Sequence, residues 1–358
     1  MRFYISIFLL WVGIFSLSAQ PSAKKLKVEA RKYAKEALPY IEKHDYQKAR
    51  SLLYSAFSLD TASYLYAYEI AYTHVLEKDY VHAIPFYKMA CKKSDVTDYC
   101  YVMLGSTYFL LGMQEEAEKA LSEGLERFPN SGRLYQAMGD VNQLNLVRAL
   151  HYYEKGVMAD PSYPMNYYWL SKLFCNSTEE MWGMLYGEIF LNLEENTARS
   201  KEISQLLFDT YKNCIKFHGD TLVTVQFCRN SLTYPNEHKT EWLPLTMIYE
   251  PCLEASVPLG GSITLASLHD IRSRFIDVYI KENYHISHPC LLFDWHKDLM
   301  KKGYFECYNY WLMRHGSPHE FDVWLSKKRE KYEDFLKWLK AHPLYVEKGR
   351  QFHRFGNK

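Results

Sequence analysis

The chain has 358 residues, of which 48% are hydrophobic and 24% charged, a composition typical of a folded protein with room for about two domains or one elongated array. Its formal net charge of +1 gives it no electrostatic footprint for nucleic acid. Tyrosine is unusually frequent at 31 residues. Its apolar ring and polar tip suit half-buried helix contacts and binding grooves.

The first 19 residues have the pattern of a secretory signal peptide. Arg2 supplies the positive charge, residues 3–17 are almost wholly apolar, and Ser18 and Ala19 provide the small residues that precede a cleavage site. We expect cleavage after Ala19, a periplasmic or secreted location, and no membrane span afterwards. The alternative is an uncleaved membrane anchor, because the apolar stretch is slightly long for a signal peptide.

A repeat with a period near 34 residues begins at about residue 30. The second half of each repeat has a small residue, then a bulky residue four positions later, then another small residue three positions after that. This pattern occurs as Ala49–Leu53–Ala56, Ala83–Tyr87–Ala90, Ala117–Leu121–Gly124 and Ala149–Tyr153–Gly156. A constant period of this length predicts a solenoid of helical hairpins.

The first half of each repeat has its own pattern. It occurs as Ala67–Ile70–Ala71–His74, Tyr101–Leu104–Gly105–Tyr108 and Tyr135–Met138–Gly139–Asn142. These residues resemble the tetratricopeptide repeat (TPR) family, with four clear repeats over residues 30–163, and we expect a fifth that extends the array to residue 195. The resemblance implies an all-α, right-handed solenoid in which Gly105 and Gly139 lie where two helices cross closely.

The resemblance also implies a concave groove lined by the first helix of each repeat. The residues expected to contact a partner there are Leu65, Tyr68, Tyr72, Tyr99, Val102, Phe109, Arg133, Gln136 and Asp140. Such a surface suits an extended or helical peptide with apolar side chains. The Lys/Asn/Arg clamp with which one subfamily grips chaperone tails is absent, since its positions hold Ala34, Leu38, Tyr68 and Tyr72.

In residues 196–358 the 34-residue pattern is lost, but helical periodicity continues. We expect helices at about residues 203–215, 241–255, 263–282, 291–314 and 318–341, and no run of alternating strands. These helices either continue the superhelix as degenerate repeats or form a separate domain. A further alternative is that they fold into the concave groove and cover it.

The chain has eight cysteines, all after residue 19. Most lie in apolar helical patterns, so we expect them to be free and buried. An even number in an exported chain nevertheless permits disulfides. Cys91 and Cys100 are the pair most suited to one, because the repeat places them on consecutive helices.

One group of residues could form a metal site, namely His285, His288 and Cys290. Cys307, His296 or Asp294 could supply a fourth ligand, but the spacing matches no established zinc motif and Pro289 suits a loop. Near residue 315, Gly316 is expected to end a helix, while Ser317 and Glu320 form the capping box of the next. No catalytic motif is present in the sequence, so no catalysis, metal or cofactor is predicted.

Together these patterns predict an exported TPR scaffold that binds a protein or peptide through a tyrosine-rich groove. The first alternative is that the C-terminal helices form a metal-binding or catalytic domain, with the TPR array as a targeting arm. The second is a structural subunit whose repeats only oligomerise.

Overall fold

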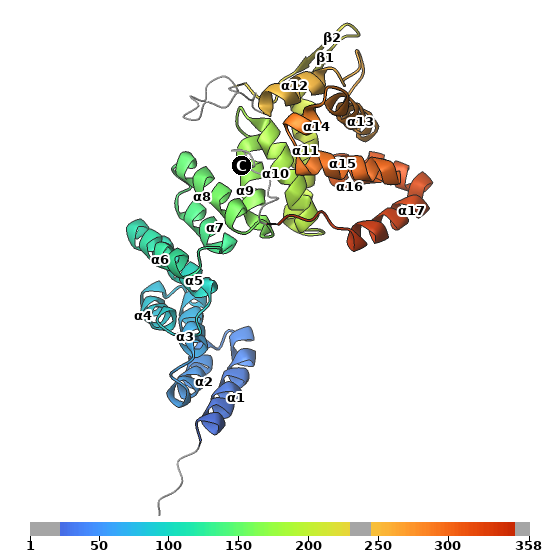
Figure 1. Cartoon of the computed structure of the whole chain (residues 1–358). Coiled ribbons are helices and arrows are strands. Elements are labelled where there is room, and N and C mark those ends of the chain that lie inside the picture. Colours follow the sequence, from blue (N-terminus) through green and yellow to red (C-terminus); the bar gives the residue numbers. More distant parts are fainter. Residues whose placement is uncertain (1–21, 230–244, 348–358) are drawn as a thin grey trace, which may run out of the picture. The chain divides into compact units, whose positions relative to one another are not determined.

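The structure is a computed structural model that describes residues 22–229 and 245–347 (Figure 1). The predicted signal peptide, the start of the helix predicted at 241–255 and residues 348–358 therefore lie outside the described residues. Seventeen helices and one two-stranded hairpin make up the secondary structure of the described part, which confirms the all-α class. None of these helices is both long and apolar enough to cross a membrane. The chain divides into two compact units after Cys100.

Unit 1 is built from two helical hairpins. They consist of α1 (Ala23–Glu42) with α2 (Tyr46–Leu59) and α3 (Tyr64–Leu76) with α4 (Tyr80–Cys91). Asp45 and Ser63 accept hydrogen bonds from backbone N–H groups at the starts of α2 and α3, so the polar residues of the turns fix where these helices begin. The fully buried Ala37 and Ala49 let α1 and α2 approach closely.

Three more hairpins follow, and only the first residues of α5 belong to unit 1. They are formed by α5 (Asp98–Leu110) with α6 (Gln114–Arg127), α7 (Gly132–Val141) with α8 (Leu146–Ala159), and α9 (Pro164–Cys175) with α10 (Glu180–Leu193). A Cβ atom added to Gly105 would lie 2.6 Å from the side chain of Leu121, and one added to Gly139 would lie 2.2 Å from that of Tyr153. The predicted close crossings are thus confirmed, and the fifth hairpin is present.

The remaining elements pack onto the last hairpins (Figure 1). They are α11 (Ala198–Cys214), β1 (Ile215–His218), β2 (Leu222–Val225), α12 (Thr246–Glu254), α13 (Leu265–Lys281), α14 (Tyr284–Ser287), α15 (Leu291–Lys302), α16 (Phe305–Met313) and α17 (Pro318–Ala341). One hydrophobic core extends from Ala149 on α8 to Val346 after α17. Helices on both sides of residue 195 share this core, and the domain boundary placed there stays a prediction.

Three local details differ from the sequence analysis. β1 and β2 form an antiparallel hairpin, with Ile215 opposite Val225, although strands were not predicted. The helix predicted at 291–314 is two helices, because Gly303 takes a left-handed conformation with φ of 73°. The capping box at the start of α17 is not formed. Instead, Glu320 accepts a hydrogen bond from the backbone N–H of Leu265 and so caps α13.

Candidate protein-binding surface and a buried charge network

The predicted groove residues of unit 1 lie together with two residues that were not predicted, Glu69 and Tyr87, in a cluster that we call the tyrosine surface. It consists of Leu65, Tyr68, Glu69 and Tyr72 on α3, Tyr99 at the start of α5, and Tyr87 of α4. The α3 members stand at spacings of three and four residues, which places them on one face of that helix. Sequence periodicity alone therefore brings them together.

The rings of the tyrosine surface contact one another directly. Tyr68 stacks on Tyr72 with ring centroids 6.3 Å apart and an interplanar angle of 8°. Tyr99 and Tyr87 tilt against Tyr68 at 5.9 Å and 5.6 Å. Leu65 is 37% exposed and Tyr99 is 42% exposed, while Tyr68 and Tyr72 are half-buried. The cluster thus presents part of its aromatic area to solvent while its other side is packed.

Two polar groups of the tyrosine surface lack partners. The hydroxyl of the fully buried Tyr87 makes no hydrogen bond within the described residues. Glu69 likewise forms no hydrogen bond or ion pair with any residue that the structure describes. Burial raises the pKa of Glu69, and burial also raises the pKa of Tyr68 and Tyr87, with the carboxylate of Glu69 adding to both effects. The carboxylate therefore lies within electrostatic reach of both phenols.

The predicted groove residues of unit 2 are arranged differently. Val102 is half-buried and Phe109 is 43% exposed on α5. On α7 the polar residues bind one another and their neighbours. Gln136 donates to Asp140 at 2.6 Å, and Asp140 also accepts from the hydroxyl of Tyr153 at 2.8 Å.

Tyr163, at the start of α9, also contacts these α7 residues. Its hydroxyl donates to the side-chain oxygen of Gln136 at 2.8 Å, and Arg133 lies over its ring at 5.9 Å. The polar groups of Gln136 and Asp140 are consequently occupied by internal hydrogen bonds. These α7 residues therefore stabilise the stacking of the repeats.

The residues of the possible metal site, His285, His288 and Cys290, lie on different elements. His285 lies on α14, His288 follows that helix, and Cys290 is buried at the start of α15. Across residues 22–229 and 245–347, no three His, Cys, Asp or Glu side chains lie close enough to hold a metal ion. The eight cysteines are free thiols, and the Sγ atoms of Cys91 and Cys100 lie 3.3 Å apart.

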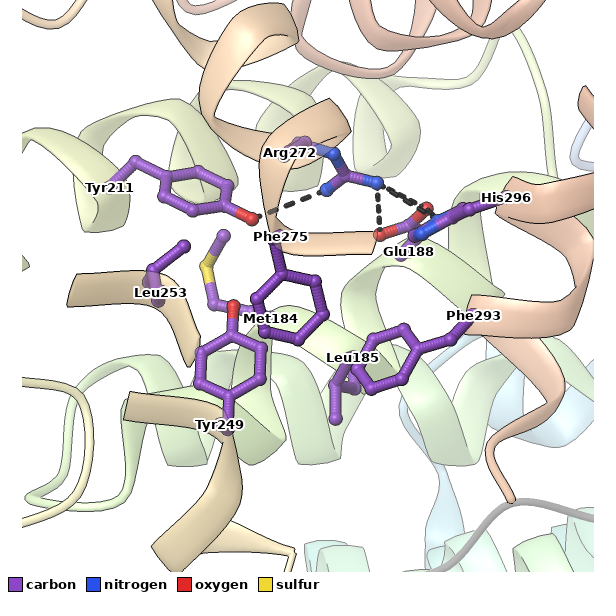
Figure 2. Close-up of a pocket in the computed structure, with 10 residues that line it drawn as sticks. All are labelled: Met184, Leu185, Glu188, Tyr211, Tyr249, Leu253, Arg272, Phe275, Phe293 and His296. Carbon is purple, nitrogen blue, oxygen red and sulfur yellow. Dashed lines mark hydrogen bonds and ion pairs between the residues drawn. The ribbon is translucent and has the colours of Figure 1, made fainter. Parts of the chain in front are cut away.

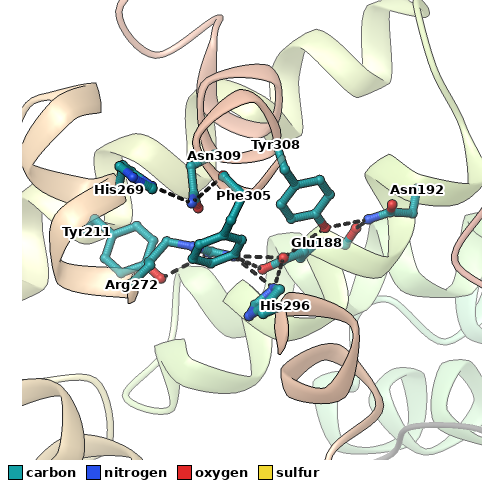
Figure 3. A network of polar contacts seen from close by, with 9 residues as sticks. All are labelled: Glu188, Asn192, Tyr211, His269, Arg272, His296, Phe305, Tyr308 and Asn309. Atoms are coloured by element: carbon teal, nitrogen blue, oxygen red, sulfur yellow. Dashed lines mark hydrogen bonds and ion pairs between the residues drawn. The ribbon is translucent and has the colours of Figure 1, made fainter. Parts of the chain in front are cut away.

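The most concentrated buried charge lies in unit 2 and was not predicted. Glu188 of α10 and Arg272 of α13 form a buried ion pair, in which one guanidinium nitrogen contacts both carboxylate oxygens at 2.8 and 2.9 Å (Figure 2). His296 of α15 contacts the same carboxylate through Nε2 at 2.5 Å, and the hydroxyl of Tyr308 of α16 donates to it at 2.8 Å (Figure 3). We call these four residues the charge network.

Neighbouring side chains extend the charge network. Asn192 donates to the hydroxyl of Tyr308 at 2.8 Å, and Arg272 donates to the hydroxyl of Tyr211 at 3.3 Å. The network thereby joins α10, α11, α13, α15 and α16 (Figure 3). Burial would raise the pKa of Glu188, but the charge of Arg272 and the hydrogen bonds from Arg272 and His296 outweigh burial and hold that pKa well below its usual range.

The cavity beside the charge network is too small for a substrate. Its volume is about 20 Å³, which has room for about one water molecule. Ligand pockets are typically some hundreds of Å³. Every residue that lines it is buried, among them Tyr249, Phe275 and Phe293 (Figure 2). The geometry therefore favours a role in holding helices together.

No protein-family model and no curated protein matches the chain. Among solved structures, PilF of Pseudomonas aeruginosa is 19% identical, with 52% of this chain and 86% of that chain covered and a TM-score of 0.44. PilW, a type IV pilus biogenesis factor, is 15% identical over 51% of this chain and 84% of its own, with a TM-score of 0.41. YrrB, a TPR protein with an unusual peptide-binding site, is 17% identical over 53% and 92%, with a TM-score of 0.33.

At such identities and TM-scores, these likenesses carry no argument about partner or activity. The chain resembles TPR proteins over about half its length.

Proposed function

We propose that this chain is an exported scaffold that binds a segment of another protein through the tyrosine surface, by equilibrium binding and without bond chemistry. The observation that carries the proposal is the partly exposed ring cluster of Tyr68, Tyr72 and Tyr99, with the unpartnered groups of Glu69 and Tyr87 beside it. Tyrosine supplies a large contact area at a small cost in conformational entropy, and for this reason it is enriched in binding surfaces.

The proposal includes Val102, Phe109, Arg133, Gln136 and Asp140 as further contact residues. Phe109 supports it by its exposure. The location we propose is periplasmic or secreted, and it rests on the signal-peptide pattern of residues 1–19. A catalytic role for the C-terminal helices has weaker support, because the charged groups gathered there enclose a cavity of only about 20 Å³.

The test is a crosslinking pull-down from the native envelope fraction, with the wild-type chain compared with Tyr68→Ala/Tyr72→Ala. We expect specific partners to be lost with the double variant, because truncation removes the stacked ring pair. Tyr345→Ala is the matched control, since Tyr345 is 64% exposed and lies in unit 2. Circular dichroism of each variant checks that the helices remain folded. An identical partner set for wild type and double variant would refute the proposal.

A further inference from the structure

We propose that the tyrosine surface recognises a cationic side chain, a lysine or arginine of the bound segment, which lies against the rings of Tyr68 and Tyr72 and pairs with the carboxylate of Glu69. This inference rests on the proposed function and names the chemistry of its partner. Three features of the surface support it: the unpaired carboxylate of Glu69, the stacked rings of Tyr68 and Tyr72, and the hydroxyl of Tyr87, which makes no hydrogen bond within the described residues.

The first feature is the position of Glu69. It stands three residues before Tyr72 and four after Leu65, so its side chain neighbours both on the surface of α3. Acidic side chains are rarely buried unless they are paired. Even the exposed Glu77 of unit 1 is paired, since Arg50 contacts it at 2.5 Å. Among the described residues, no lysine or arginine pairs with Glu69, so its carboxylate is open to a counter-charge supplied by a bound partner.

The second feature is the ring pair. Tyr68 and Tyr72 are nearly parallel, with an interplanar angle of 8°. The face of a tyrosine ring attracts lysine or arginine that comes within about 6 Å of its centroid. The chain uses this contact itself, because Lys48 lies 4.7 Å from the centroid of Tyr40. A cation from a partner would find the same attraction at the tyrosine surface, strengthened by the carboxylate of Glu69.

The third feature is the hydroxyl of Tyr87. Its ring lies 5.6 Å from that of Tyr68 and is fully buried, yet its hydroxyl has no partner in the described residues. A buried hydroxyl without a hydrogen bond is unfavourable, because it has lost the hydrogen bonds that water would make with it. A guanidinium or ammonium group carries several N–H donors, so in the proposed complex it pairs with Glu69 and, once the rings that cover this oxygen move aside, donates to it as well. An aliphatic side chain can satisfy neither of them.

Partners of other chemistry fit less well. An anionic segment would meet the like charge of Glu69. A purely apolar segment would cover Glu69 without a counter-ion, and a buried unpaired charge is strongly destabilising. Charge complementarity therefore selects a cationic segment with apolar or aromatic neighbours, which Leu65 and Tyr99 would contact.

The experiment uses an array of synthetic 12-residue peptides of randomised sequence, probed with the purified full chain. We expect bound peptides to be enriched in arginine and lysine beside apolar residues. Glu69→Gln keeps the shape and removes the charge, and we expect it to weaken the best peptide by about tenfold or more. Replacing the key arginine of that peptide with citrulline should give a similar loss. Glu29→Gln, at an exposed position on α1, is the control and should change nothing.

The two possible failures are distinguishable. Peptides that bind through Tyr68 and Tyr72 but show no cation enrichment, or no loss with Glu69→Gln, would overturn the cation site and leave the proposed function standing. Peptides that bind equally well to Tyr68→Ala/Tyr72→Ala would overturn both. Thermal melts of each variant confirm that a loss of binding is not a loss of fold.

Discussion

Removing the positive member of the charge network should strongly destabilise unit 2. Arg272→Met keeps most of the aliphatic stem but leaves Glu188 buried with only neutral or weakly basic neighbours. The side chains of Glu188 and Arg272 are 3% and 7% exposed, so solvent cannot replace the lost partner. Breaking a buried pair on one side typically costs about 3–5 kcal/mol, and the hydrogen bond to Tyr211 is lost as well. We expect a total cost of about 4 kcal/mol.

Urea denaturation followed by tryptophan fluorescence measures this cost in unit 2. Within the described residues every tryptophan lies in unit 2, and residues 20–100 contain none. With an m-value of about 2–3 kcal/mol/M, the midpoint should fall by about 1.5 M urea. Arg274→Met on the same helix is the control, because Arg274 is exposed. Its midpoint should stay near that of the wild type.

A second variant separates the ion pair from mere packing. Glu188→Leu/Arg272→Met removes both charges, and replacing a whole buried pair with apolar residues is often neutral or stabilising. We therefore expect the double variant to be more stable than Arg272→Met alone. An Arg272→Met midpoint within about 0.3 M of the wild type would refute the reasoning, because it would mean that the carboxylate is not held in place by its cation.

Four further predictions concern Glu188, Gly139, the Cys91–Cys100 pair and Glu69. The pKa of Glu188 is held below its usual range, so the stabilisation by this carboxylate is fully present above the normal glutamate pKa and is lost as the pH falls below that value. In an acid titration followed by tryptophan fluorescence, the wild type should therefore lose folded protein more steeply than Glu188→Leu/Arg272→Met. Gly139→Ala should lower stability by about 1–3 kcal/mol in thermal melts, since its Cβ would overlap a buried ring. Oxidised glutathione should convert Cys91 and Cys100 into a disulfide by thiol–disulfide exchange in the partly opened chain, which mass spectrometry detects as the loss of two hydrogens. Burial raises the pKa of Glu69, so binding of a cationic peptide should weaken on acidification at a higher pH than for an ordinary glutamate.

The repeat region could be predicted because its contacts are local. Each small residue of a hairpin meets a partner within the same or the next repeat, as Gly105 meets Leu121, so a constant period fixes the packing. The tyrosine surface follows from the same periodicity, because Tyr68 and Tyr72 share a helix face.

The charge network could not be predicted in this way. Glu188 meets Arg272 84 residues further along the chain and His296 108 residues further, and no local period encodes such contacts. One signal was available: Glu188 is the sole charged residue between residues 181 and 193, in a helix pattern that is otherwise almost wholly apolar. A charge in that setting indicates a buried ionic partner, but the sequence does not say which.

The contrast between Glu69 and Asp140 separates binding residues from structural ones. Asp140 has its oxygens occupied by Tyr153 and Gln136, so Asp140→Ala would leave the hydroxyl of the buried Tyr153 and the partly buried amide of Gln136 unpaired and should cost about 1–3 kcal/mol of stability. Glu69 has no such partners, and burial disfavours its charge. Glu69→Gln should therefore leave the melting temperature unchanged or raise it, while peptide binding falls. Destabilisation by Glu69→Gln would contradict this reading, because it would mean that the carboxylate supports the fold. A residue that costs stability and is needed for binding is the signature of a functional site.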